Sequence, residues 1–251
     1  MSMPNLSARE RTQCQQFTEF TGTRLDVAAK CLRKNNWNIH QALEAFWERP
    51  DAFSTAPSCD MEALHKLFDI YKDADEDAIG IEGLLQFCTD LDVPPDDIRM
   101  LILCFNLQVK SAVHWPRAEF IGGMANLGCD SIDKVKSSFS GMQADLGQPA
   151  QFKALYEYAF DISRQEGQKV LDLQTALQLW RMLLAEKFAH LERWCSYMET
   201  EYQKSVNKDT WLLTLDFALT ADATMSNIDL DNSAWPIVID EFVEHFRANR
   251  T

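Results

Sequence analysis

The spacing of apolar residues constrains this chain more than any other feature of its sequence. Most segments repeat apolar residues at intervals of three and four, as in Leu25-Ala28-Ala29-Leu32, which is the period of a helix with one buried face. Glycine and proline, which turn-rich sheets use freely, number only 9 and 8 among 251 residues. The pattern therefore predicts an all-α fold. Further stripes occur at Ile98-Leu101-Ile102-Phe105, Phe152-Leu155-Tyr156-Ala159, Leu173-Ala176-Leu177-Trp180 and Ile239-Phe242-Val243-Phe246.

The helical patterns fall into two groups separated by a linker. Three short helices are expected within residues 1–48, which is a small domain near the lower size limit for independent folding. Residues 49–59 are rich in Pro, Ser and Ala with little periodicity, and they form the predicted linker. A larger helical domain is expected over residues 60–247, followed by a tail at 248–251.

Two motifs in the small domain mark helix starts. Ser7 is followed three residues later by Glu10, and Asn38 by Gln41. In such pairs, the first side chain accepts a hydrogen bond from the backbone of the helix, and the second can return one. We therefore expect helices to begin after Ser7 and after Asn38.

Three helices of the large domain carry more apolar residues than one core face needs. Two interpretations stay open, because helices buried on all sides and helices lining a peptide pocket have the same pattern. The additional residues are Met100, Leu103 and Leu107, then Tyr158 and Ile162, and finally Leu179, Met182 and Leu183.

Charge and composition exclude several classes of function. The net charge of −14, with no extended run among the 24 Lys and Arg residues, is unsuited to nucleic acid and favours a basic protein partner. No apolar window is long enough for a membrane span, and the first residues lack the apolar core of a signal peptide. Seven cysteines without paired spacing indicate reduced, mostly buried thiols, as expected in the cytoplasm or nucleus.

Catalytic and metal-binding motifs are likewise not found, so we expect neither an enzyme nor a bound cofactor or metal. The acidic run Asp73–Asp77 invites comparison with a calcium-binding EF-hand loop. Counted from Asp73, however, Ala78 replaces the glycine of position 6 and Leu84 the bidentate Glu of position 12. The favoured interpretation is an EF-hand-like helix pair without metal, with a calcium-responsive sensor kept as the alternative.

The segment from Asp209 to Glu244 contains eight acidic residues and no Lys or Arg. A solvated acidic face is one explanation. The alternative is an acidic patch that binds Lys and Arg of a partner, with Trp211 and Trp235 near helix starts or exposed turns as aromatic anchors.

Several motifs resemble the defective-in-cullin-neddylation family. The characteristic segments are KVLDLQTALQLWRMLL (169–184), DTWLLTLDF (209–217) and SAWPIVIDEFVEHF (233–246), supported by IGIEGLLQFC (79–88) and LGCDSIDKVK (127–136). Their order and spacing are similar to those of the potentiating-neddylation domain of that family across about residues 60–247. Residues 1–48 resemble a ubiquitin-associated domain.

The resemblance implies a non-catalytic scaffold that binds a cullin together with the neddylation conjugating enzyme. Such a scaffold accelerates transfer of the ubiquitin-like modifier to the cullin through proximity and orientation. It also implies that Asp209, Ala234 and Asp240 contact the basic C-terminal winged-helix region of the cullin. The chemistry of these residues agrees with such a contact, because carboxylates form strong hydrogen bonds with Lys and Arg and a small Ala allows a partner to approach closely.

The resemblance further implies an apolar pocket for the acetylated N-terminal methionine of the conjugating enzyme. A free ammonium would lose its hydration there, so acetylation is expected to matter. Ala112 stands where the family has a polar amide, and Leu179 where it has an aromatic residue. The matching positions are Ile81, Leu84, Cys88, Met100, Leu103, Ala112, Val113, Trp115, Ile162, Leu179 and Met182.

For the small domain, the resemblance implies ubiquitin binding. The loop sequence Phe-Thr-Gly departs from the usual Met-Gly-aromatic, so a purely structural role is an alternative. A ubiquitin-binding adaptor unrelated to cullins is a second alternative for the whole chain. The candidate contacts are Phe20, Thr21, Gly22, Leu43, Phe46 and Trp47.

Overall fold

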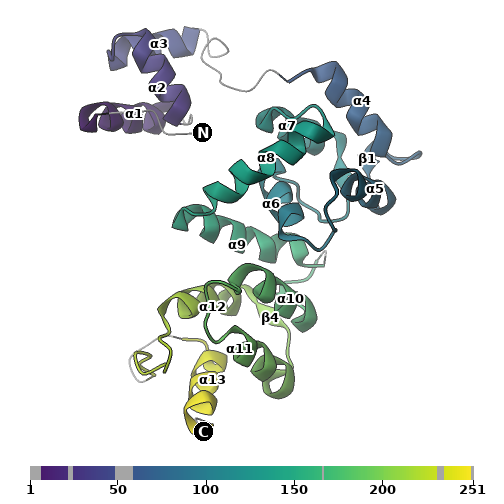
Figure 1. Ribbon diagram of the computed structural model, residues 1–251, viewed down its shortest axis with the longest axis vertical. Helices are drawn as coiled ribbons and strands as arrows, with labels where there is room; N and C mark the ends of the chain where they lie inside the picture. The colour runs from purple at the N-terminus through teal and green to yellow at the C-terminus, as the bar shows by residue number, and fades with distance from the viewer. Residues whose placement is uncertain (1–6, 22–24, 49–58, 166, 231–234, 250–251) are drawn as a thin grey trace. The chain divides into compact units, whose positions relative to one another are not determined.

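The computed structural model describes residues 7–21, 25–48, 59–165, 167–230 and 235–249. Contacts divide the chain into two compact units, Met1–Cys59 and Asp60–Thr251. Helices make up nearly all the regular structure of the described residues, with only two-residue strands beside them, which confirms the predicted all-α class (Figure 1). Within the described part of the chain, every helix is too short or too polar to cross a membrane.

The first unit is a three-helix domain. The predicted caps are present, because the Ser7 N–H donates to the Glu10 carboxylate at 2.7 Å and the Gln41 N–H donates to Asn38 Oδ1 at 3.2 Å. The helices are α1 (Ala8–Thr21), α2 (Leu25–Lys34) and α3 (Ile39–Glu48). Their core consists of Cys14, Phe17, Val27, Ala28, Ala29, Cys31, Leu32, Ala42 and Phe46.

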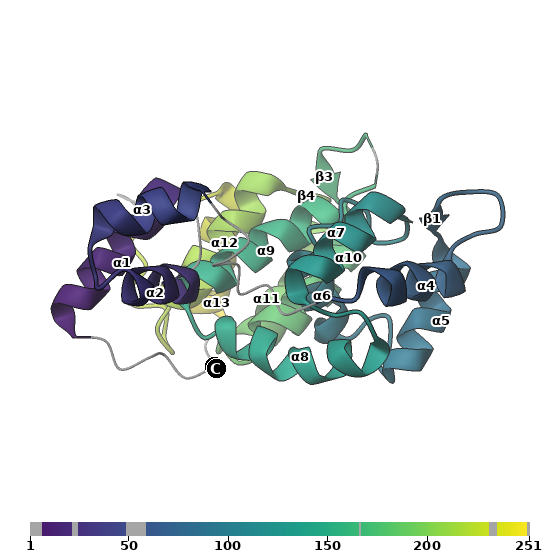
Figure 2. The same cartoon turned by 90° about the horizontal axis from the view of Figure 1, so that it is seen from above.

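The second unit begins with two helix–loop–helix pairs. They are α4 (Met61–Tyr71) with α5 (Ile81–Leu91), and α6 (Ile98–Leu107) with α7 (Arg117–Leu127). Antiparallel pairing of β1 (Ala78–Ile79) with β2 (Trp115–Pro116) joins the two loops. Helices α4 and α5 lie side by side (Figure 2), since a Cβ on Gly83 would lie 1.9 Å from the Tyr71 carbonyl oxygen. Helix α8 (Ile132–Asp145) packs on α5 and α6.

The rest of the second unit is built on α9, which contacts α6, α10 and α12. In Figure 1, α4–α8 lie on one side of α9 and α10–α13 on the other. The elements are α9 (Pro149–Ser163), β3 (Val170–Leu171), α10 (Leu173–Leu184), α11 (Leu191–Tyr197), the π-helical turn η2 (Met198–Tyr202), β4 (Val206–Asn207), α12 (Lys208–Thr220) and α13 (Ile237–Ala248). Strands β3 and β4 pair antiparallel.

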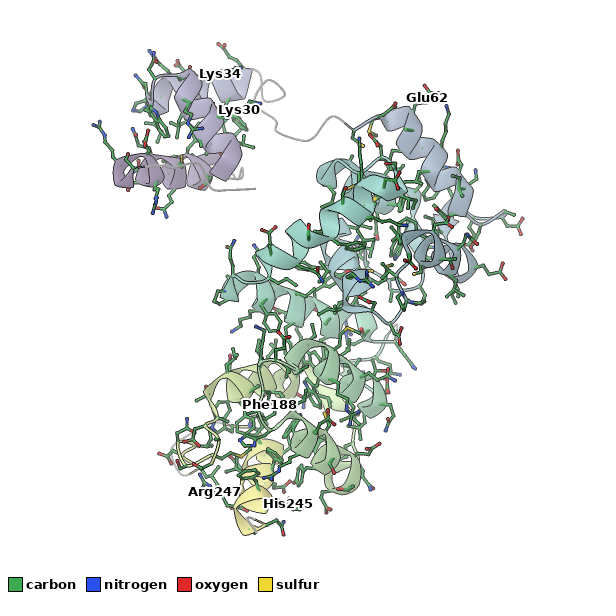
Figure 3. All side chains as sticks on the ribbon, viewed as in Figure 1. Lys30, Lys34, Glu62, Phe188, His245 and Arg247 are labelled. Carbon is green, nitrogen blue, oxygen red and sulfur yellow. The ribbon has the colours of Figure 1, made fainter. Side chains whose placement is uncertain are left out.

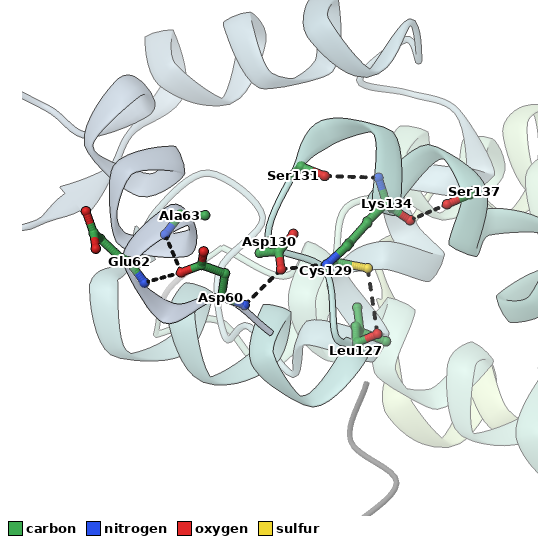
Figure 4. A network of polar contacts seen from close by, with 9 residues as sticks. All are labelled: Asp60, Glu62, Ala63, Leu127, Cys129, Asp130, Ser131, Lys134 and Ser137. Atoms are coloured by element: carbon green, nitrogen blue, oxygen red, sulfur yellow. Dashed lines mark hydrogen bonds and ion pairs between the residues drawn. The ribbon is translucent and has the colours of Figure 1, made fainter. Parts of the chain in front are cut away.

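A polar network fastens the start of α4 to the loop before α8 (Figure 4). The Asp130 carboxylate accepts hydrogen bonds from the Asp60 N–H at 2.9 Å and from Lys134 Nζ at 2.6 Å. Asp60 in turn caps α4 by accepting from the N–H groups of Glu62 and Ala63. These hydrogen bonds therefore anchor Asp60, the first residue of the second unit, to the loop before α8.

The acidic loop between α4 and α5 is held by a cationic side chain of α7. The Arg117 guanidinium donates to Asp69 at 2.8 Å and to Asp77 at 2.7 Å, and it lies over the ring of Phe68 at 4.2 Å. Among the described residues, no three His, Cys, Asp or Glu side chains are grouped so as to hold a metal ion. The EF-hand-like character of the helix pairs stays a prediction.

Candidate functional site

A cavity of about 770 Å³ opens in the second unit between α5, α6, the loop before β2, the end of α9 and α10. All the predicted pocket residues except Leu103 line it, although they come from segments up to 101 residues apart (81 to 182). The predicted residues in its wall are Ile81, Leu84, Cys88, Met100, Ala112, Val113, Trp115, Ile162, Leu179 and Met182. Their role in binding stays a prediction.

Helical spacing explains how each segment supplies its part of the wall. On α5, positions 81, 84 and 88 lie on one face at i, i+3 and i+7, and α10 contributes positions 179 and 182 at i and i+3. The loop before β2 is held in place by two hydrogen bonds: Trp115 Nε1 donates to the Ser111 carbonyl at 3.0 Å and the Tyr158 hydroxyl to the Val109 carbonyl at 2.8 Å. The cavity wall is therefore formed by fixed elements.

Burial changes from the floor of the cavity to its mouth. Leu84 and Met100 are buried, whereas Ile81 and Val113 are 60% and 53% exposed at the mouth. Leu103 has no exposed surface and does not line the cavity, so its side chain belongs to the core. The additional apolar residues therefore divide into cavity-lining residues and core residues, and Leu107 and Leu183 belong to the core. That the cavity binds a peptide stays a prediction.

The ionisable groups of the wall leave its floor uncharged. Burial raises the pKa of the Cys88 thiol, and burial together with the neighbouring Cys88 raises the pKa of Cys104 to about 12. Asp97 lies at the rim, where it caps α6 and pairs with Arg99 at 2.7 Å, and this hydrogen bonding lowers the pKa of Asp97. An apolar group without charge fits such a floor better than an ammonium.

The predicted acidic surface lies at the starts of α12 and α13. Asp209 is exposed in the first turn of α12, and Asp240 lies half-buried in the first turn of α13. Ala234 falls outside the described residues. Among the described side chains, Asp240 Oδ1 is a buried oxygen with no hydrogen-bond partner, and burial followed by the charge of Glu244 raises the pKa of this carboxyl. A buried acceptor without a donor costs stability, and a positive charge near this carboxyl would favour its ionised form.

Other acidic residues of the same segment have internal roles. Asp222 accepts hydrogen bonds from Thr224 and Ser226, from the N–H and the hydroxyl of each, and these bonds hold its pKa well below the usual range. Asp216 lies 4.0 Å from Lys153 Nζ. The acidic excess between positions 209 and 244 is therefore partly structural.

The expected anchor role of Trp211 is wrong. Its side chain has no exposed surface and stacks between Tyr156 and Trp180, with ring centroids 4.4 and 5.4 Å away. Residues near a helix start are often exposed, but Trp211 lies on the face of α12 that packs against α9. Trp235 is half-buried, with its ring 6.0 Å from that of Phe217.

The candidate ubiquitin contacts in the first unit separate into surface and core residues. Phe20 and Trp47 are 67% and 64% exposed. Phe46 is buried and packs edge-to-face on Phe17 at 5.7 Å, so its side chain belongs to the core. Leu43 is partly buried, and the Thr21 hydroxyl donates to the Phe17 carbonyl. Gly22 lies outside the described residues.

Some residues of these surfaces were not anticipated from the sequence. Leu85, Leu101 and Cys104 also line the cavity, and Ile237 stands 75% exposed in the first turn of α13. The helical phase of Ile237, off the stripe that begins at Ile239, was the available signal.

Comparison with known protein families gives a match within each unit. Residues 134–245 match the family described as cullin binding, and residues 11–52 match the one described as a UBA-like domain. The fold and these matches define an all-α protein with an N-terminal ubiquitin-associated-like domain and a cullin-binding-type domain.

Curated relatives specify the family. The chain is 32% identical to defective in cullin neddylation protein 1 of Yarrowia lipolytica over 240 residues, which are 94% of this chain and 96% of that protein. It is 35% identical to human DCN1-like protein 5 (70% of this chain, 74% of that protein) and 33% identical to zebrafish (Danio rerio) DCN1-like protein 4 (88% and 76%). The chain belongs to the defective-in-cullin-neddylation family.

Proposed function

We propose that this chain is a scaffold of cullin neddylation that binds a cullin through Asp209, Ala234 and Asp240. At the same time it binds the N-acetylated terminus of the conjugating enzyme in the cavity. It contributes no catalytic side chain. Instead, it promotes transfer of the modifier by raising the local concentration of the conjugating enzyme at the cullin. The reducing compartment that suits its seven cysteines is the cytoplasm or nucleus.

The convergence of the predicted pocket residues is the observation that carries this proposal. Four separate helices, one loop and strand β2 bring ten predicted side chains to a single, mostly apolar cavity. Its floor has neutral thiols and buried aliphatic side chains, so an acetylated methionine can fill it with little loss of hydration. A free amine would have to leave its water behind, which strongly disfavours the unmodified terminus.

The acidic surface supports the cullin half of the proposal. The Asp240 carboxylate is half-buried and lacks a compensating positive charge among the described residues, so a lysine or arginine of a partner at its exposed side would favour the ionised form. The segment from 209 to 244 has no basic residue that could compete for it.

A calorimetric titration tests the pocket. The full chain is titrated with a peptide of the conjugating-enzyme N-terminus, once N-acetylated and once free. We expect the acetylated peptide to bind at least about a hundredfold more tightly, because an ammonium in an apolar site loses several kcal/mol of hydration. Equal affinities would reject the acetyl-methionine pocket.

A second function is favoured by the exposed aromatic side chains of the first unit. The side chains of Phe20 and Trp47 are mostly exposed, and exposed aromatic residues are frequent binding anchors. We propose that they bind ubiquitin. Titration of ¹⁵N-labelled ubiquitin with the full chain should give saturable chemical-shift changes; an unchanged spectrum at millimolar concentration would favour a purely structural role.

A further inference from the structure

The wall of the cavity is rich in sulfur. Two thiols and two thioethers line it: Cys88 on α5, Met100 and Cys104 on α6, and Met182 on α10. The whole chain of 251 residues has only 7 Cys and 9 Met, so sulfur-bearing side chains are concentrated at this place. A pocket for an apolar group needs apolar surface, which aliphatic side chains supply equally well. The concentration of sulfur therefore indicates a further kind of chemistry at the cavity.

Three of these side chains come from adjacent places on α5 and α6. Met100 and Cys104 are four residues apart on α6, so they lie on the same face of that helix with Cβ atoms about 5–6 Å apart. Burial is the main cause of the raised pKa of the Cys104 thiol, and the charge of Cys88 contributes to it, so the two thiols lie close together. Cys88, Met100 and Cys104 each keep 5–7% of their surface exposed and line the cavity, so a small ion that enters can reach all three.

We propose that Cys88, Met100 and Cys104 form a binding site for a soft monovalent metal ion, Cu(I), in the wall of the cavity. Thiolate and thioether sulfur atoms are soft, polarisable ligands and select Cu(I) over hard cations. We call these three residues the sulfur site.

The donor atoms of the sulfur site disfavour the commoner metal ions. Zn²⁺ takes four ligands from Cys, His, Asp or Glu, and no three such side chains are grouped for this purpose in the part of the chain that the structure describes. Mg²⁺ and Ca²⁺ require oxygen ligands. Cu(I) is stable with fewer ligands than Zn²⁺, so two thiolates and one thioether are sufficient for it.

Binding exchanges protons for the metal without a redox step. Cu(I) bonds to the sulfur atoms of Cys88 and Cys104, both thiol protons pass to solvent, and copper keeps its oxidation state. Because burial raises the pKa of both thiols, the protons are present in the metal-free protein at neutral pH and leave only when the ion binds. The complex carries one negative charge spread over several atoms, which is less costly to bury than two separate thiolates.

A bound ion would also occupy part of the wall that the acetylated methionine contacts. Copper and the peptide should therefore compete for the cavity. This competition rests on the proposed function, whereas binding of the metal does not.

An anaerobic titration of the full chain with Cu(I), in the presence of a chromophoric Cu(I) chelator, tests the site. Excess chelator leaves copper only to sites with several sulfur ligands. We expect the wild-type chain to retain about one Cu(I), Cys88→Ala and Cys104→Ala to lose it, and Met100→Leu to bind it about tenfold more weakly. Cys195→Ala, at a buried thiol of α11 outside the cavity, is the matched control and should retain the metal. A wild-type chain that loses all its copper to the chelator would overturn the proposal.

Two measurements on the wild-type chain keep the test valid even where a variant fails to fold. X-ray absorption at the copper edge should show sulfur neighbours alone, and a shell of nitrogen or oxygen would overturn the sulfur site. Calorimetry in buffers of different ionisation enthalpy should show release of about two protons per copper. Binding without proton release would likewise exclude the two thiols as ligands.

Titration with the acetylated peptide separates this inference from the proposed function. The copper-loaded chain should bind the peptide at least about tenfold more weakly than the metal-free chain. Equal affinities would place the copper outside the cavity and overturn the proposal. If the metal-free chain does not bind the peptide while copper is retained on sulfur, the proposed function fails and the sulfur site stands.

Discussion

Tyr156 and Trp211 exchange hydrogen bonds across the junction of α9 and α12. The Tyr156 hydroxyl donates to the Trp211 carbonyl, and the Trp211 indole donates to the Tyr156 carbonyl, both at 2.9 Å. The indole of Trp180 donates to the same tyrosine hydroxyl at 2.8 Å. Because α9 carries Ile162 of the cavity and α12 carries Asp209, this buried junction joins the two proposed binding surfaces within the second unit.

Replacing Tyr156 with Phe should destabilise the second unit without disturbing its fold. The change leaves the Trp180 indole and the Trp211 carbonyl without their buried partner, which costs about 1–3 kcal/mol. Urea unfolding should show a lower midpoint with an unchanged slope. Tyr202→Phe, at a partly exposed tyrosine in η2, is the control and should have no effect. Wild-type stability in Tyr156→Phe would mean that the hydrogen bonds contribute nothing.

A charge at the mouth of the cavity should block peptide binding. Val113 lines the cavity and is 53% exposed, so Val113→Asp places a carboxylate at the mouth without unfolding the protein. We expect affinity for the acetylated peptide to fall at least about tenfold, because the carboxylate must be desolvated when the peptide binds. Calorimetry measures it, with Ile70→Asp as the exposed control on α4. Equal losses in both variants would point to a general charge effect.

Asp240→Asn should stabilise the free protein while weakening its binding to a cullin. Burial raises the pKa of Asp240 in the folded state, so folding favours the protonated form. Stability from this group is therefore highest at acidic pH and falls as pH rises from the unfolded pKa through the folded one. Asn cannot ionise, so the variant should gain about 0.5 kcal/mol at pH 7 and nothing at pH 3. Thermal unfolding at both pH values checks this, and a variant less stable at pH 7 would contradict it.

Arg247 should stabilise the loop segment around Met225 and Ile228, which follows α12. Its guanidinium projects from α13 (Figure 3) and donates from Nη2 to the carbonyl oxygens of Met225 and Ile228, at 2.7 and 2.8 Å. Arg247→Gln should cost about 1–3 kcal/mol, since hydrogen bonds from a charged donor are lost. Amide hydrogen exchange should accelerate at Thr224 and Ser226, whose N–H groups bond to Asp222 within this loop. Unchanged protection there would show that Asp222 alone holds the loop.

Alanine substitutions at the adjacent residues Phe46 and Trp47 of α3 should have different effects, one on stability and the other on ubiquitin binding. Phe46→Ala creates a cavity in a small core, and a loss of about 3–5 kcal/mol should unfold the first unit. Trp47→Ala removes an exposed side chain, so the unit should stay folded while its affinity for ubiquitin falls. Circular dichroism of the isolated first unit and titration with ubiquitin by the full chain measure the two effects. If Trp47→Ala binds ubiquitin with full affinity, Trp47 is not part of the ubiquitin contact.

Local features of this protein could be predicted from its sequence because they depend on neighbours three or four residues apart. Ser7 with Glu10 and Asn38 with Gln41 cap their helices as their spacing indicates, and the apolar periodicity marks the helices themselves. The resemblance of whole motifs additionally named the residues of the cavity and the acidic surface. Only that resemblance predicted that these residues lie together, because the apolar periodicity within α5 does not show that α5 lies near α10.

Tertiary packing decided which residues of each pattern face a partner. Met100 and Leu103 belong to the same apolar stripe of α6, yet Met100 lines the cavity and Leu103 is core. The position of Trp211 near a helix start suggested a surface anchor, but its ring is buried against Tyr156 of α9 and Trp180 of α10. A side chain's burial depends on elements distant in the chain. The sequence by itself therefore determined the helices and their apolar faces, and only their packing determined which of those faces stayed open.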